Sequence, residues 1–238
     1  MIFDFDTRGS ELPLVQSIWR SRSEGGGSFI STATSQWEMV VTQQKDHLTL
    51  SVRGPETRAS LAPVPVEAEF FGVVFQHGVF MPQLPKSELV DHAIHLTASI
   101  KNRFQFLGST WEFPTFDNID TFVARLVRAG ILSFDTTVAD VLGGQTLYLS
   151  QRSIQRRFLY VTGLTYKTIQ QIKRARQASL LLKEGVPIAE TAHETGYFDQ
   201  AHLTNSLKRY YGQTPVEIAN QARLHSGVFF QDENSPAQ

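Results

Sequence analysis

One internal repeat limits what the C-terminal half of this chain can fold into. The segment SQRSIQRRFLYVTGLTY, Ser150–Tyr166, matches DQAHLTNSLKRYYGQTP, Asp199–Pro215, in physical type at an offset of 49 residues. Each segment opens on a residue that favours a helix N-cap, and each reaches a glycine, Gly163 or Gly212, after about three turns. The repeat therefore predicts two helices of equal length with the same start and stop signals.

Apolar residues recur along one face of both predicted helices. They are Ile154, Phe158 and Val161 in the first helix and Leu203, Leu207 and Tyr210 in the second. Spacings of three and four residues are typical of one buried helix face. We expect both stripes to pack in a hydrophobic core.

The faces opposite these stripes carry amides and cations, and neither has a carboxylate beyond the cap. Their residues are Gln151, Arg152, Gln155 and Arg156 in the first helix and Gln200, Ala201, Thr204, Asn205 and Lys208 in the second. A solvated helix face usually mixes acidic with basic residues, whereas Arg, Gln and Asn can pair with base edges in the major groove. An ordinary solvated surface is the alternative for one such helix, but two in register favour DNA binding.

Residues from about Phe122 to Ile218 resemble the DNA-binding domain of AraC-type transcription regulators, which contains two helix-turn-helix units. The specific part is IAETAHETGYFDQAHLTNSLKRYYGQTPVEI, Ile188–Ile218. It fits the family's first helix, turn, recognition helix and closing turn at Ile188, Ala189, Ala192, Gly196, Tyr197, Asp199–Tyr210, Gly212, Thr214 and Pro215. The resemblance implies a sequence-specific DNA-binding regulator whose recognition helices enter successive major grooves, about 34 Å apart.

The residue types and the resemblance together give candidate contacts. Bases are expected to meet Gln151, Arg152, Gln155 and Arg156 from the first recognition helix and Gln200, Ala201, His202, Thr204 and Asn205 from the second. Phosphate contacts, which position the protein without reading sequence, are expected from Lys173, Arg174, Lys208 and Arg209. The long helix between the units, KTIQQIKRARQASLLLKEG, resembles the family's connecting helix at Arg174, Ala178, Leu181 and Leu182.

The first unit departs from the second in the length of its turn. Ala192 lies seven residues before the cap Asp199, but the comparable Ala139 lies eleven residues before Ser150, and Gly143 and Gly144 are among the additional residues. A longer turn costs little free energy, yet it can tilt the helix that follows. Such a tilt would move the first recognition helix away from the groove and weaken its base contacts.

The charge of the chain is divided unevenly. Residues 1–116 have 9 basic and 12 acidic side chains, whereas residues 150–223 have 11 basic and 5 acidic ones. Such an asymmetry points to a polyanion-binding module joined to a second module. Cysteine is absent, which excludes disulfides, thiolate metal sites and a cysteine nucleophile.

The first 115 residues are predicted to be mainly β. Strand-like runs cover Leu14–Trp19, Trp37–Thr42, His47–Val52 and Ala68–Phe75, and the second and third are predicted to form a hairpin. We expect an α+β chain: a β-rich sensor or dimerisation domain at 1–116, an all-α double helix-turn-helix domain with a long joining helix at 117–223, and a flexible tail at 224–238. An amphipathic helix is predicted from Ile119 to Ala129, and Leu84–Leu96 is not assigned. The β part is similar in layout to the cupin-like barrel or sandwich that precedes the DNA-binding domain in many relatives.

This β part offers candidate residues for a small-molecule effector. Trp19, Trp37, Phe70, Phe71, Phe75, Phe80 and Trp111 are candidates for an apolar pocket, although most are expected to be core, and Arg20, Arg53 and Glu38 are candidates for orienting a polar ligand. His47 and His77 stand apart from other ligands, so no metal, cofactor or catalytic site is expected. A ligand-free module for dimerisation or polymerase contact is the alternative to an effector domain, and a cupin-type enzyme is a weaker one.

The expected partners follow from the same resemblance. They are double-stranded DNA, RNA polymerase, a small-molecule effector and a second copy of the chain. No apolar run is long enough to cross a membrane and no secretory signal is expected at the N-terminus, so we expect a bacterial cytoplasmic protein associated with the nucleoid.

Overall fold

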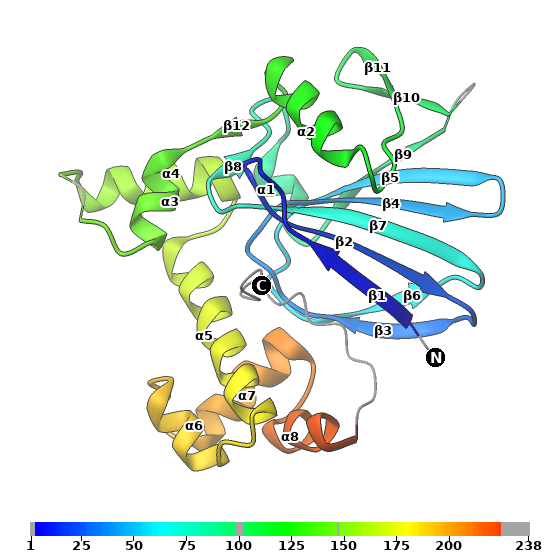
Figure 1. Cartoon of the computed structure of the whole chain (residues 1–238). Coiled ribbons are helices and arrows are strands. Elements are labelled where there is room, and N and C mark those ends of the chain that lie inside the picture. The colour runs from blue at the N-terminus through cyan, green and yellow to red at the C-terminus, as the bar shows by residue number, and fades with distance from the viewer. Residues whose placement is uncertain (1–2, 99–101, 147, 225–238) are drawn as a thin grey trace.

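The computed structural model describes residues 3–98, 102–146 and 148–224. A β-rich part is followed by a helical part (Figure 1), which confirms the predicted α+β organisation. Within the described residues, no helix has both the length and the apolar character needed to cross a membrane. The tail predicted at 224–238 lies outside the described residues except for Leu224.

The β part is organised around a six-stranded antiparallel sheet. Its strands, in spatial order, are β1 (Phe3–Arg8), β2 (Val15–Ser23), β7 (Ala68–Phe75), β4 (Glu38–Gln44), β5 (His47–Arg53) and β9 (Ala93–Thr97). The predicted hairpin is confirmed, because β4 and β5 pair in register from Glu38 and Arg53 to Gln44 and His47. The predicted strand Ala68–Phe75 is also confirmed, in the middle of the sheet.

The two faces of the sheet have different coverings. Ile18, Met39, Leu50, Val52 and Val73 point to one face, where they join the main hydrophobic core. Because side chains alternate along a strand, their neighbours point to the opposite face. That opposite face is covered by a separate antiparallel pair, β3 (Gly27–Ser31) and β6 (Ser60–Val64).

Helix α2 (Ile119–Arg128) packs on the core face of the sheet. Its buried residues Ile119, Phe122, Val123 and Leu126 belong to the same cluster as the strand residues. The pair β10 (Arg103–Phe106) and β11 (Ser109–Glu112) contributes Phe104, Phe106 and Trp111 to this cluster. The helix itself was predicted, and its buried residues pack in the core of the β part.

Short elements connect the two parts of the chain. The unassigned segment Leu84–Leu96 contains the one-turn helix α1 (Lys86–Leu89) and the start of β9. Strand β8 (Val79–Phe80) pairs with β12 (Ser133–Phe134), which directly precedes the first helix of the helical part. The chain therefore enters the helical part from the surface of the β part.

The helical part has six helices among the described residues. They are α3 (Thr136–Leu142), α4 (Gln151–Thr162), α5 (Tyr166–Lys183), α6 (Ile188–Glu194), α7 (Gln200–Tyr211) and α8 (Pro215–Leu224). Figure 1 shows α5 running from the α3–α4 pair to the α6, α7 and α8 helices. A second hydrophobic cluster contains the predicted stripe residues Phe158, Val161, Leu203, Leu207 and Tyr210.

Both repeated helices begin and end as predicted. The Ser150 hydroxyl accepts from the Ser153 backbone N–H at 3.1 Å, and the Asp199 carboxylate accepts from the His202 backbone N–H at 2.7 Å. Gly163 and Gly212 close the helices with φ of 74° and 68°, a left-handed conformation that favours glycine. The start and stop signals of the repeat are confirmed.

Candidate DNA-binding surface and effector cavity

The first recognition helix, α4, exposes all four residues predicted to contact bases. Gln151, Arg152, Gln155 and Arg156 are exposed, while Phe158 on the opposite side is fully buried. No acidic residue lies in the first turn of the helix. The N-terminal half of α4 therefore presents cations and amides to solvent, as contact with the major groove requires.

The second recognition helix, α7, presents a less uniform surface. Gln200, Ala201, His202 and Asn205 are exposed, and Thr204 is half-buried. The Thr204 hydroxyl donates to the Gln200 carbonyl at 2.7 Å, and the His202 ring meets the Tyr197 ring edge-on at a centroid distance of 5.0 Å. Thr204 and His202 thus have contacts within the protein in addition to the predicted base contacts.

The candidate phosphate contacts fall into two groups. Lys208 and Arg209 are exposed at the end of α7. Arg174 lies over the Tyr197 ring at 5.6 Å and its Nη1 is 3.5 Å from the Gly196 carbonyl oxygen. Lys173 on the same helix, α5, is half-buried, and its charge helps to lower the pKa of His77 in the β part. Lys173 and Arg174 therefore have structural contacts, and phosphate binding by all four residues stays a prediction.

Two apolar residues next to the recognition helices were missed from sequence. Tyr148 and Phe198 have exposed fractions of 106% and 92%, and both lie just before the helix caps. An apolar residue before a cap often packs on the fourth helical residue, but Leu203 at that position of α7 is fully buried while Phe198 is open to solvent. The position of Phe198 directly before the cap Asp199 was the sequence feature that could have identified it.

The C-terminal end of α7 contacts the β part through its backbone. The backbone N–H groups of Ala33 and Ala59 donate to the carbonyls of Tyr210 and Arg209, each at 2.8 Å. A Cβ added to Gly212 would lie 3.0 Å from Ile30 Cγ2. These contacts link the end of α7 to the β3–β6 pair.

Helix α4 is attached to the β part by side chains. The Tyr160 ring meets Phe80 at 5.5 Å, and the Lys86 ammonium lies 4.8 Å from the Tyr160 ring centre. Lys86 also donates to the Pro82 carbonyl at 2.8 Å, and burial lowers the pKa of this lysine. The N-terminal turns of α4 and α7 are thus left exposed while their other ends are held.

His77 lies between β7 and β8, within reach of the charges of Lys173 and Arg176 on α5. Its Nε2 is 2.9 Å from the Ser35 hydroxyl oxygen. Burial, together with the positive charges of Lys173 and Arg176, lowers the pKa of His77 to about 3. The imidazole is therefore neutral at neutral pH.

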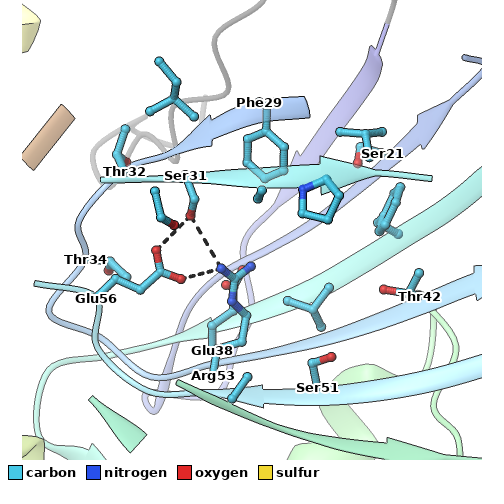
Figure 2. A pocket seen from close by; sticks show the side chains of 18 of the residues that line it. Ser21, Phe29, Ser31, Thr32, Thr34, Glu38, Thr42, Ser51, Arg53 and Glu56 are labelled. Carbon is cyan, nitrogen blue, oxygen red and sulfur yellow. Dashed lines mark hydrogen bonds and ion pairs between the residues drawn. The ribbon is translucent and has the colours of Figure 1, made fainter. Parts of the chain in front are cut away.

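A cavity of about 570 Å³ lies between the large sheet and the β3–β6 pair. This volume is within the usual range for small-molecule sites. Figure 2 shows its charged end, where Arg53 pairs with Glu56 and Ser31 donates to Glu56 at 2.8 Å. Glu38 lies beside Arg53 in the same view.

The cavity uses only part of the predicted ligand-binding set. Of the seven aromatic candidates, Trp19 and Phe70 line it, whereas Trp37, Phe75, Phe80 and Trp111 are buried in the two clusters and Phe71 packs partly buried against the main core. Glu38 and Arg53 line it as predicted, but Arg20 does not, because it pairs with Asp6 at 2.7 Å instead. The described residues hold no group of three or more His, Asp or Glu arranged for a metal ion.

Comparison with known proteins addresses the helical part. The sequence model of a family described as "Helix-turn-helix domain" matches residues 144–221. These residues form an AraC-type helix-turn-helix domain. The chain thus carries the DNA-binding domain found in transcription regulators of this type.

The relatives of this AraC-type domain include two curated regulators. The HTH-type transcriptional regulator VirS of Mycobacterium tuberculosis is 29% identical over 143 residues, which cover 58% of this chain and 38% of VirS. RipA of Corynebacterium diphtheriae is 27% identical over 104 residues, which cover 43% of this chain and 31% of RipA. The chain thus spans well under half the length of these relatives.

Solved structures of ToxT from Vibrio cholerae also align with the chain. One has 10% sequence identity and a TM-score of 0.42, and the alignment covers 91% of this chain and 98% of ToxT. In another, ToxT is bound to (E)-4-(8-methylnaphthalen-1-yl)but-3-enoic acid, with 12% identity and a TM-score of 0.40, and 92% and 99% of the two chains are covered.

Proposed function

We propose that this protein is a sequence-specific transcription regulator that reads two successive major grooves with α4 and α7. The observation that supports it is the exposed, carboxylate-free face on the N-terminal half of both helices, each with the same cap and the same glycine stop. Helix α5 joins the two units, as a reader of adjacent grooves requires. Phe198 joins the predicted contacts, because an exposed aromatic ring beside a recognition helix can pack on a thymine methyl group.

We further propose that a small molecule in the cavity controls DNA binding. Thr32 and Thr34 line the cavity and flank Ala33, whose N–H is bonded to α7, while Arg58 and Ser60 line it and flank Ala59. A ligand that shifts either loop therefore acts directly on the last turn of the second recognition helix. Dimerisation and contact with RNA polymerase stay predictions from the family resemblance.

The groove-reading proposal is tested by DNA selection with the whole chain. Fragments of bacterial genomic DNA retained by the protein should share one sequence pattern with two parts on one side of the duplex. Retention of fragments with no shared pattern, at affinities equal to random DNA, would contradict sequence-specific reading.

Two substitutions then separate base from phosphate contact. Arg156→Ala should cost about 1 to 3 kcal/mol on the selected site and relax the preference at one position. Lys208→Ala should weaken binding evenly on all sequences and reduce its salt dependence. Arg103→Ala, which removes an exposed charge on β10, is the matched control and should change neither. Equal losses for Arg156→Ala on selected and random DNA would rule out its reading role.

Effector control is tested by a thermal-shift screen of the protein against a metabolite library. A ligand at about 100 times its dissociation constant adds about 2.7 kcal/mol to stability. The affinity for the selected DNA should then change in the presence of that compound. If stabilising compounds leave DNA affinity unchanged, the β part acts as a module without effector control.

A further inference from the structure

The cavity has a wall of aromatic rings. Phe5, Trp19, Phe29 and Phe70 line it, and the Phe5 and Trp19 rings stack at a centroid distance of 5.8 Å. Trp19 lies over the backbone of Gly72, where an added Cβ would come within 2.8 Å of the indole. The glycine thus lets the indole lie flat on the sheet, and the wall accommodates a flat apolar group.

The charged end of the cavity carries two carboxylates for one guanidinium. Glu38 and Arg53 are direct neighbours across β4 and β5, and Arg53 also forms an ion pair with Glu56. Glu38 is only 7% exposed and accepts from the Trp19 indole N–H at 2.8 Å. Burial opposes the charge on Arg53, but Glu38 and Glu56 raise the pKa of Arg53 above its usual value. The guanidinium therefore stays charged.

This balance of charge selects against an anionic ligand. At the rim, the exposed Arg58 and Asp91 contribute one charge of each sign. The lining therefore has three carboxylates for two guanidinium groups. A ligand carboxylate would add a third negative charge at a poorly hydrated end, which is unfavourable, whereas a protonated nitrogen would balance the charge.

The aromatic wall adds a second preference for a cation. Ring faces of Trp and Phe attract positive charge, with Trp the strongest. The hydrogen bond from Trp19 holds the Glu38 carboxylate at the edge of the indole ring. The carboxylate therefore lies at the edge of the aromatic wall, where a molecule stacked on the rings can place a cation beside Glu38.

We propose that the cavity binds an organic cation, with a flat apolar body against the aromatic wall and a protonated nitrogen beside Glu38. This inference rests on the proposed effector control, because the same cavity is the effector site. It names the ligand class: protonated aromatic amines and similar cations, in preference to carboxylic acids of the same size.

Calorimetric titration of the whole chain with matched probes tests the ligand class. The probes are 2-(naphthalen-1-yl)ethylamine, 2-(naphthalen-1-yl)ethanol and naphthalen-1-ylacetic acid, with 2-phenylethylamine and phenylacetic acid as a smaller pair. We expect at least one amine to bind about tenfold or more tightly than the alcohol or acid of its size. Binding of an acid as tight as that of its amine, or no binding by either amine, would overturn the proposal.

Substitution at the charged end locates the preference. Glu38→Gln keeps an oxygen that can accept from the Trp19 indole but removes the charge, and it should reduce amine binding about tenfold while leaving alcohol binding unchanged. Glu112→Gln, which removes an exposed carboxylate on β11, is the control and should bind like the original chain. If Glu38→Gln does not fold, Glu56→Gln should show the same loss. An unchanged amine preference in a folded Glu38→Gln or Glu56→Gln variant contradicts the placement of the nitrogen.

Measurement of DNA affinity in the same samples separates this inference from the proposed function. If the protein binds its selected DNA but no amine binds the cavity, the ligand class is wrong and DNA recognition stands. If an amine binds with the expected preference but leaves DNA affinity unchanged, the cavity chemistry stands and effector control is wrong.

Discussion

The two helix-turn-helix units follow one template in their helices but not in their turns. The first turn covers residues 143–150, whereas the second covers only residues 195–199. Tyr148 and Tyr197 occupy the same position of the repeat, yet Tyr148 is fully exposed and Tyr197 is 7% exposed. The shorter turn packs its tyrosine against His202 and Ser206 of α7, whereas the longer turn leaves its tyrosine exposed.

Equivalent residues of the two recognition helices make different contacts with the rest of their units. Arg157 of α4 forms an ion pair with Asp135, which also caps α3. The corresponding Ser206 of α7 is hydrogen-bonded to the Tyr197 hydroxyl at 2.7 Å. In the first unit an ion pair therefore joins α4 to the N-terminus of α3, and in the second unit a hydrogen bond joins α7 to the buried tyrosine of the turn. The caps and glycines of the repeat thus give both units the same helices, while the contacts that join the helices of each unit differ along with the turns.

The largest expected difference between the units comes from their tyrosines. Tyr197→Ala should lower the free energy of unfolding by about 3 kcal/mol, because it removes a buried ring and its hydrogen bond. Tyr148→Ala should change it by about 0.5 kcal/mol or less, because the ring contacts solvent. Chemical denaturation followed by circular dichroism measures both. Similar losses for the two variants would contradict the difference in packing between the two tyrosines.

Helix α5 is common to both units, and the pH dependence of stability tests the surroundings of His77, which lies near the charges of this helix. The pKa of His77 is lowered to about 3 by burial and by Lys173 and Arg176, whereas the unfolded chain takes up this proton near pH 6.5. The folded state binds fewer protons between these values, so stability is full above pH 6.5 and falls as the pH drops. The loss between pH 6.5 and 5 should be roughly 1 to 2 kcal/mol.

His77→Gln should remove this part of the pH dependence, and the exposed His47→Gln should keep it. Denaturation midpoints at several pH values measure the difference. A His77→Gln profile as steep as that of the original chain would show that the junction with α5 is not the acid-sensitive contact.

The braces of the two units should differ in their response to salt. Asp135→Asn keeps an acceptor for the α3 cap but removes the ion pair, and it should cost about 1 to 2 kcal/mol in dilute buffer and less at high salt. Ser206→Ala should cost about 1 kcal/mol at any salt concentration, because its hydrogen bond is partly buried and uncharged. Denaturation at low and high ionic strength measures both, and equal salt dependence would contradict the difference in bracing.

The caps should show the smallest difference, because they belong to the shared template. Ser150→Ala and Asp199→Ala should each cost about 1 kcal/mol, through loss of one side-chain acceptor at a helix N-terminus. Thermal unfolding followed by circular dichroism measures the two losses. A loss confined to one variant would mean that the helices are not equivalent.

Much of the DNA-binding surface could be predicted from local sequence. Helix limits follow from caps, glycines and apolar spacing, which act within a few residues, so α4 and α7 were placed correctly. The contacts that Arg174 and His202 make within the protein were not predictable, because both depend on Tyr197, which packs against them from the turn.

The cavity was less predictable than the helices. Strand alternation indicated that side chains near Glu38 and Arg53 lie on two faces, but it could not say which face is covered. The pairing of β3 with β6 over that face creates the cavity, and strands distant in sequence must meet to form it. Arg20 was a wrong candidate for the cavity because it follows the lining residue Trp19 along β2 and therefore points to the other face, where it pairs with Asp6 of β1.

By itself, the sequence determined the elements of this protein: two like helices with exposed cations and amides, a joining helix and a run of β-strands. Helix caps, turns and hydrophobic periodicity depend on residues close together in the sequence, so they can be predicted from it. Only the tertiary structure decided which charges meet in the cavity, where Ala33 and Ala59 touch the last turn of α7, and how each turn is braced. Those contacts join residues far apart along the chain, and only the folded backbone brings them within bonding distance.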